Sequence, residues 1–140
     1  MRVFSRVRAS LPRAETARLA RAVLRAEGVR SAVVSIAFVG RRRIRGLNRR
    51  HLGRDRETDV IAFGLGGVRG LVVGDIYCAP EVAARQAARF GTAPRDELRR
   101  LVVHGVLHVL GYDHPEGPGR TRGRMWRRQE QLLARAGRRR

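Results

Sequence analysis

Three histidines fall at fixed intervals in one short stretch of the chain, His104-Gly-Val-Leu-His108-Val-Leu-Gly111-Tyr-Asp-His114. Residues four apart lie above one another on one face of an α-helix, so the spacing predicts that His104 and His108 share a helical face. Gly111 can leave that helix with a positive φ and turn the chain back, which brings His114 to the other two. Catalytic zinc sites typically have three protein ligands and an open fourth position, whereas structural sites are closed by four. The motif therefore predicts one zinc ion per chain, bound by His104, His108 and His114.

Two other interpretations of this motif stay open. Histidines near the end of a helix complement its dipole, which explains one of them but not the pair spaced four apart. Metzincin proteases share the spacing H-E-x-x-H-x-x-G-x-x-H, and they need the glutamate after the first histidine as general base. Position 105 is glycine here, so the ligand frame is present and the base is missing. A metalloprotease-like hydrolase is disfavoured for this reason.

The hydrophobic pattern along the chain predicts a small α/β (α+β) fold. Apolar runs rich in valine and isoleucine predict about four strands in one mixed sheet, and about five amphipathic helices that cover it. We expect one domain over 1–136 and a frayed basic tail over 137–140. The expected strands are 3–7, 31–39, 58–63 and 71–78, and the expected helices are 12–28, 41–49, 80–90, 94–110 and 124–136.

The charge of the chain points to a polyanionic partner. The 140 residues include 31 basic and 12 acidic ones, every basic residue is arginine, and the formal charge is +19. A field of this size attracts polyanions by steering and counterion release, so nucleic acid is the expected partner. An anionic membrane surface is the alternative, but no apolar run approaches the ~20 residues of a membrane span. One cysteine forbids an internal disulfide and no secretory signal is visible, so we expect a cytoplasmic protein.

Several further residues are candidates for the site. The basic segment 48–56 leads into a strand and could grip phosphates. Asp75 lies inside an apolar strand, where a carboxylate is costly unless paired, so it either orients a metal-bound histidine, holds an arginine or marks an exposed strand end. Asp113 either contacts a zinc ligand or stabilises the turn. Cys78 is interpreted as a small buried apolar residue rather than a fourth ligand. Trp126 either stacks on a base or anchors the last helix.

Taken together, these residues resemble a known family, the bacterial YbeY-type endoribonucleases, which are zinc-dependent enzymes of ribosomal RNA maturation. The family signature H-G-x-L-H-x-x-G-Y-D-H is matched at every specified position of 104–114. The upstream pattern L-N-x-x-Y-R-x-K-D-x-P-T-D-V-L-S-F is matched in part, and the pattern G-D-I is matched in full. The matching residues outside the histidine motif are Leu47, Asn48, Asp55, Thr58, Asp59, Val60, Phe63, Gly74, Asp75, Ile76, Met125 and Glu130.

The resemblance implies a fold, an activity and partners. It implies a four-stranded sheet with about five helices and a zinc ion at the end of a cleft. The implied activity is zinc-dependent, single-strand-specific endonucleolytic cleavage in ribosomal RNA processing, notably 3′-end maturation of the small-subunit RNA, and in ribosome quality control. The implied partners are single-stranded RNA, ribosomal RNA, the small ribosomal subunit, a ribosomal protein and an assembly GTPase.

One departure from the family pattern concerns a functional arginine. The family's Tyr-Arg pair aligns with His51-Leu52 here, and a leucine cannot bind or activate the scissile phosphate. Arg54, at the family's lysine position, or Arg50 would supply the positive charge instead. The alternative function is therefore a zinc-stabilised RNA- or ribosome-binding assembly factor with little or no nuclease activity.

Overall fold

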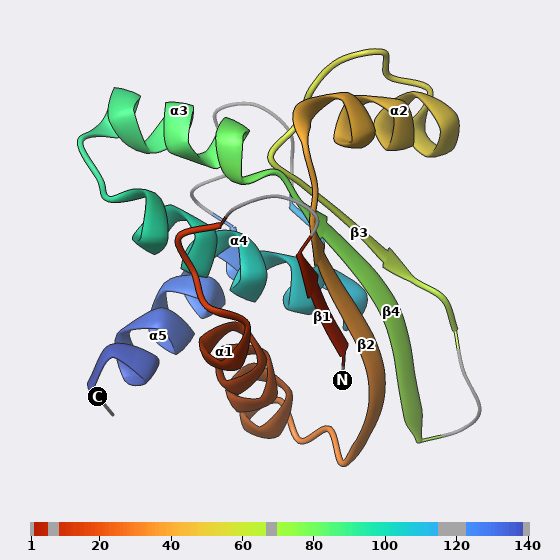
Figure 1. Ribbon diagram of the computed structural model, residues 1–140. Coiled ribbons are helices and arrows are strands. Elements are labelled where there is room, and N and C mark those ends of the chain that lie inside the picture. Colours follow the sequence, from red (N-terminus) through yellow and green to blue (C-terminus); the bar gives the residue numbers. More distant parts are fainter. Residues whose placement is uncertain (1, 6–8, 67–69, 115–122, 139–140) are drawn as a thin grey trace.

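The computed structural model describes residues 2–5, 9–66, 70–114 and 123–138, which form four strands and five helices (Figure 1). The strands build one mixed sheet in the order β1-β2-β4-β3. β1, β2 and β4 run parallel, and β3 pairs antiparallel with β4 at one edge. The predicted mixed sheet of about four strands is confirmed. The strands are β1 (Arg2–Ser5), β2 (Ser31–Phe38), β3 (Val60–Gly64) and β4 (Leu71–Cys78).

The helix α4 organises the packing of the other helices. It contacts β3 and β4 of the sheet, and it also contacts α1, α3 and α5 (Figure 1). Most of its length between Leu98 and Leu107 is buried for this reason, with Arg100 only partly buried. Among the described residues, no helix has the length and apolar character needed to cross a membrane. The helices are α1 (Arg13–Ala26), α2 (Arg41–Leu52), α3 (Pro80–Phe90), α4 (Pro94–Val109) and α5 (Arg124–Arg138).

The element bounds follow the sequence pattern closely, with two instructive differences. α2 continues three residues beyond the predicted end at 49 and stops at Leu52, because Gly53 adopts the left-handed conformation (φ +68°). α5 continues to Arg138, so the first half of the expected basic tail 137–140 is helical. Residues 6–7, the end of the first expected strand, and residues 139–140 lie outside the described residues.

The core lies between the sheet and the helices. Alternate residues of a strand point to opposite faces of a sheet, and the inward residues of β2 and β4 are fully buried, among them Ile36, Phe38 and Ile76. Cys78 belongs to the same core, and burial raises the pKa of its thiol. The prediction of a buried apolar cysteine is therefore confirmed.

Candidate metal centre

The three histidines of the motif come together at the C-terminal end of α4. Their ligand nitrogens lie within 4.8 Å of one another. The ring centroids of His104 and His108 are 4.6 Å apart, and each lies 5.0 Å from the ring of His114. His104 is buried and the other two rings are half-buried. The cluster could therefore hold one metal ion, and the predicted convergence of the rings is present in the structure.

The turn that brings back the third histidine is a Schellman motif at the end of α4. The Gly111 N–H donates to the His108 carbonyl and the Tyr112 N–H donates to the Leu107 carbonyl, both at 3.0 Å. Gly111 has a φ of +99°, which side-chain-bearing residues rarely adopt. This glycine therefore reverses the chain at the point where the sequence predicts it.

Asp113 completes the turn through the backbone. Its Oδ1 accepts a hydrogen bond of 2.9 Å from the N–H of His114, as aspartates in turns commonly do. The described contact of Asp113 is thus with the main chain of the third histidine, although its side chain also lines the cavity beside the cluster.

Two hydrogen bonds fix the protonation of the helical histidines. His104 Nδ1 donates to Gln129 Oε1 at 2.8 Å, and His108 Nδ1 donates to the backbone carbonyl of Tyr112 at 3.0 Å. An amide or peptide oxygen only accepts, so both rings carry their proton on Nδ1. This leaves the Nε2 lone pair of each ring available for a metal, as in known histidine sites with outer hydrogen-bond partners. The donor set therefore fits a zinc-type ion.

Gln129 also belongs to the site, although the sequence motifs do not predict this. It is 2% exposed on α5, and its Nε2 donates to Glu130 Oε2 at 3.3 Å. Glu130 in turn accepts hydrogen bonds from Nε and Nη2 of Arg100 at 3.3 and 3.1 Å. A chain of contacts thus runs from His104 through α5 and back to α4. The one signal in the sequence is a glutamine on the apolar face of a predicted helix.

A cavity of about 550 Å³ opens beside the histidines. One wall is formed by the three rings and the other by the end of α2, segment 53–59 and the start of β3. Two arginines, Arg54 and Arg56, lie on its wall, and the phosphate contact expected of Arg54 stays a prediction. The polar residues contributed by α2 and segment 53–59 are Asn48, Arg54, Arg56, Thr58 and Asp59.

In segment 53–59, arginines that line the cavity alternate with acidic residues that pair with arginines of neighbouring helices. Asp55 accepts a hydrogen bond from Arg45 Nε at 2.9 Å, and this contact lowers the pKa of its carboxyl. Glu57 is hydrogen-bonded to Arg85 of α3, which lowers the pKa of Glu57 in the same way. The acidic side chains therefore tie the segment to α2 and α3, while the residues between them line the cavity.

Asn48 holds the same segment from inside. This buried side chain donates from Nδ2 to the carbonyl of Arg56 at 3.0 Å, and the main-chain carbonyl of Asn48 accepts from the N–H of Arg54 at 3.3 Å. Both arginines of the cavity wall are thus fixed through their main chain by one residue. In the sequence, this role of Asn48 is indicated by its match to the L-N pattern of the family.

The comparisons with known proteins agree with the geometry. A family model described as Endoribonuclease YbeY matches residues 5–137. The chain belongs to the YbeY family. The Endoribonuclease YbeY of Pelotomaculum thermopropionicum is 42% identical over 126 residues, which cover 84% of this chain and 82% of the relative. That of Chlorobium phaeovibrioides is 34% identical over 134 residues, which cover 95% and 88%.

A solved structure shows the same fold. The solution structure of TM1509 from Thermotoga maritima superposes with a TM-score of 0.61 at 24% sequence identity, and the match covers 97% of this chain and 89% of that chain. The likeness concerns the arrangement of helices and strands.

In this member of the YbeY family, the glycine after the first histidine has a packing role. A Cβ built on Gly105 would lie 2.7 Å from Cγ2 of Ile76 on β4. α4 therefore approaches the sheet more closely than any side chain at 105 would allow. The position faces β4, so it cannot carry the general base of a metzincin without displacing the strand.

Arg50, one of the two candidate phosphate contacts, is not part of the YbeY cavity wall. It is an exposed residue in the last turn of α2, and it is not one of the described residues that line the cavity. Helix geometry explains the difference, because α2 continues through 50 and turns this side chain away from the segment that follows. Arg56 stands at the cavity in its place.

Asp75 lies on the opposite face of the sheet from the histidines. Its neighbour Ile76 meets Gly105 of α4, so the alternation along β4 turns Asp75 away from that helix. Its Oδ1 accepts a hydrogen bond of 2.5 Å from the hydroxyl of Ser35, its partner residue on β2. The expected contact with a metal-bound histidine is therefore not made, and the strand is central rather than exposed at an edge.

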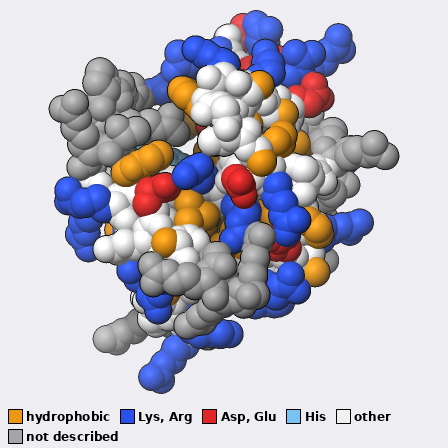
Figure 2. Space-filling view, turned by 90° about the vertical axis from the view of Figure 1, so that its left-hand side faces the viewer, with side chains coloured by type: hydrophobic (Ala, Val, Ile, Leu, Met, Phe, Trp, Pro, Cys, Tyr) orange, Lys and Arg blue, Asp and Glu red, His pale blue; other side chains and the backbone are white. Residues whose placement is uncertain are grey.

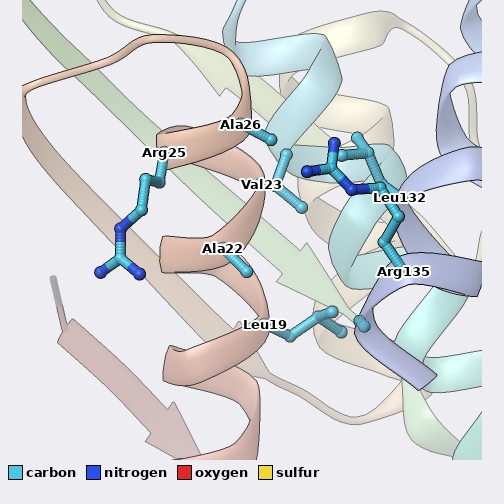
Figure 3. Close-up of a pocket in the computed structure, with 8 residues that line it drawn as sticks. Leu19, Ala22, Val23, Arg25, Ala26, Leu132 and Arg135 are labelled. Atoms are coloured by element: carbon cyan, nitrogen blue, oxygen red, sulfur yellow. The ribbon is translucent and has the colours of Figure 1, made fainter. Parts of the chain in front are cut away.

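A smaller cavity of about 190 Å³ lies between α1 and α5 (Figure 3). Leu19 and Val23 of α1 point toward Leu132 of α5 there, while Arg25 extends away from the cavity. Its lining is alanine, leucine, valine and arginine, without a metal-ligating side chain. This lining offers no catalytic chemistry, in contrast to the lining of the histidine cavity.

Proposed function

We propose that this protein is a zinc-dependent, single-strand-specific endoribonuclease that acts in ribosomal RNA processing. The observation that carries the proposal is the convergence of three imidazoles on the wall of a cavity that also holds two arginines. The Endoribonuclease YbeY names of the relatives support an endonucleolytic activity on RNA. The steps we assign are 3′-end maturation of the small-subunit RNA and ribosome quality control, in the cytoplasm.

Zinc is the metal that suits the donor set best. His104 and His108 would hold it through Nε2 together with a ring nitrogen of His114, and neutral imidazoles in this number are typical ligands of catalytic zinc. A bound zinc ion would supply Lewis acidity to the scissile phosphate and to an attacking water or hydroxyl group. Gln129 and the Tyr112 carbonyl keep two of the rings in the required tautomer and orientation.

The arginines of the cavity would act on the phosphate. A phosphodiester gains negative charge on its oxygens as it is attacked, so a fixed cation stabilises the transition state more than the ground state. Arg54 and Arg56 are placed for this role by Asn48 and by the acidic anchors of segment 53–59. Leu52, which replaces the family's arginine, lines the same cavity at 52% exposure and contributes no charge.

This leucine favours a second candidate function, a zinc-stabilised RNA- or ribosome-binding assembly factor. In that case the metal site would stabilise the turn at the end of α4, and the charge of +19 would hold RNA without cleaving it. The proposed partners are the same in both cases: ribosomal RNA, the small ribosomal subunit, a ribosomal protein and an assembly GTPase.

A single-turnover cleavage assay distinguishes the two. The protein, loaded with zinc and in excess over an end-labelled single-stranded RNA, should produce internal cuts that stop on addition of a chelator and return with zinc. A duplex of the same sequence is the matched substrate control and should remain intact. Cleavage that persists after the metal is removed would contradict the metal mechanism. RNA binding without any zinc-dependent cleavage would support the assembly factor.

A further inference from the structure

A third cavity, of about 500 Å³, lies over α4 between α3 and α5. Phe90, the last residue of α3, contributes to one side, and Trp126, in the first turn of α5, contributes to the other. Leu101 and His104 of α4 also line this cavity. We refer to this cavity as the aromatic groove. Its volume lies within the range of small-molecule sites, which runs from about 300 to 1,000 Å³.

The aromatic groove lies next to the candidate metal centre. His104 and Asp59 line both the groove and the histidine cavity. Gln129, whose side chain holds His104, also lines the groove. The two cavities therefore lie on either side of the buried His104.

The lining of the groove combines aromatic rings with charged side chains of both signs, Arg89 and Arg100 together with Asp59 and Glu97. Phe90 is 72% exposed, more than any other large hydrophobic residue among those described. Arg89 is exposed next to it, and Arg100 is held in place by Glu130. From the side of α3 and α5, arginine side chains surround hydrophobic and acidic ones (Figure 2). Aromatic rings on which bases stack, with cations for the phosphates, are the usual means of binding single strands.

We propose that the aromatic groove is a nucleobase subsite that takes an unpaired base of the RNA strand near the phosphate to be cleaved. The base stacks against Phe90 and Trp126, and Arg89 contacts the backbone beside it. This inference rests on the proposed RNA substrate, and it adds a reason for single-strand specificity: a base in a duplex is not available to enter the groove.

The chain provides its own probe, because Trp126 is its one tryptophan. Intrinsic fluorescence is titrated with a short 2′-O-methyl, phosphorothioate oligonucleotide that resists cleavage, and with the same oligonucleotide carrying abasic positions. We expect the intact strand to quench the fluorescence at saturation, and the abasic strand to bind more weakly and to quench little. Equal affinity and equal quenching by both strands would overturn the subsite.

Phe90→Ala supplies a second measurement that does not depend on α5. The side chain is exposed, so its removal leaves the fold intact, and loss of one stacking contact should weaken binding of the intact strand by roughly 5- to 100-fold. Val33→Ala, which truncates another exposed apolar residue on β2, should leave binding within about twofold. An unchanged affinity in Phe90→Ala would overturn the proposal.

The outcomes separate this inference from the proposed function. Zinc-dependent cleavage with no quenching and no effect of Phe90→Ala would reject the subsite alone, and would favour a side chain of a partner protein as occupant of the groove. Base-dependent quenching with no cleavage under any metal condition would support the subsite and reject the endoribonuclease.

Discussion

Gln129 lies 25 residues after His104, yet its side-chain oxygen accepts a hydrogen bond of 2.8 Å from Nδ1 of that histidine. The contact joins α5 to the candidate metal centre on α4 and selects the tautomer that presents Nε2 to the cavity. The last helix therefore contributes to the site although it supplies no metal ligand. The same helix carries Trp126 of the aromatic groove.

Gln129→Leu should weaken zinc binding by about 10- to 100-fold, the usual effect of removing an outer hydrogen-bond partner of a metal ligand. The measurement is a competition titration against a chromophoric chelator. Gln129→Glu, which keeps an acceptor oxygen, should restore most of the affinity. Gln131→Leu, an exposed glutamine on the same helix, is the matched control and should bind zinc like the parent. Equal affinities in both leucine variants would contradict the role of Gln129.

His114→Ala should abolish both stoichiometric zinc and RNA cleavage while RNA binding persists, because the basic surface remains. Elemental analysis and single-turnover cleavage are measured on the same sample. His51→Ala is the control, since this fourth histidine lies on α2 outside the cluster and its ring packs against Phe63 at 5.1 Å. The three-ligand assignment fails if His114→Ala retains one zinc ion per chain with unchanged affinity.

Leu52→Arg should raise the single-turnover cleavage rate by about 10-fold or more, because it adds a cation at the rim of the histidine cavity. The leucine is half exposed, so the longer side chain needs no repacking. Leu65→Arg, at a comparably exposed leucine outside the cavity, controls for the added charge. If the two variants cleave at the same rate, the position of the arginine does not matter and the effect is only general attraction of RNA.

The ion pairs that anchor segment 53–59 should be lost at low pH. The pKa of Asp55 is lowered below its ordinary 3.8 by the hydrogen bond from Arg45, and that of Glu57 below 4.5 by Arg85. Because each carboxyl has a lower pKa in the folded state, its ion pair contributes fully to the stability of the fold above the ordinary pKa. This contribution is lost as the pH falls through the lowered pKa. Carboxyl NMR titration should show this, and Arg45→Met should move the midpoint of Asp55 upward. An unchanged midpoint would mean that the ion pair does not form in solution.

Gly105→Ala should destabilise the fold by about 1 to 3 kcal/mol, because its methyl group would overlap Ile76 across the α4–β4 contact. Gly46→Ala is the matched control inside α2, where a Cβ meets nothing within 4 Å. There the replacement should stabilise by up to about 1 kcal/mol through helix propensity. Both are measured by urea unfolding. A Gly105→Ala variant as stable as Gly46→Ala would show that α4 and β4 do not pack as closely as described.

The sequence by itself determined the features that depend on local geometry. The four-residue spacing of His104 and His108 places them on one helical face whatever surrounds the helix. Gly111 supplies the positive φ that brings back His114, and the apolar run 71–78 forms a strand with the predicted bounds. These features follow from backbone periodicity and from the conformations that each residue type allows, and both can be read within a few residues.

Only the tertiary structure decided which side chains meet from distant parts of the chain. Strand alternation turns Asp75 to the far face of the sheet, and the longer α2 turns Arg50 away while Asn48 fixes Arg56 at the cavity. Gln129 reaches His104 only because α5 packs on α4. Such contacts depend on strand order, register and helix packing, which arise from the burial of apolar surface over the whole chain and leave no short-range pattern in the sequence.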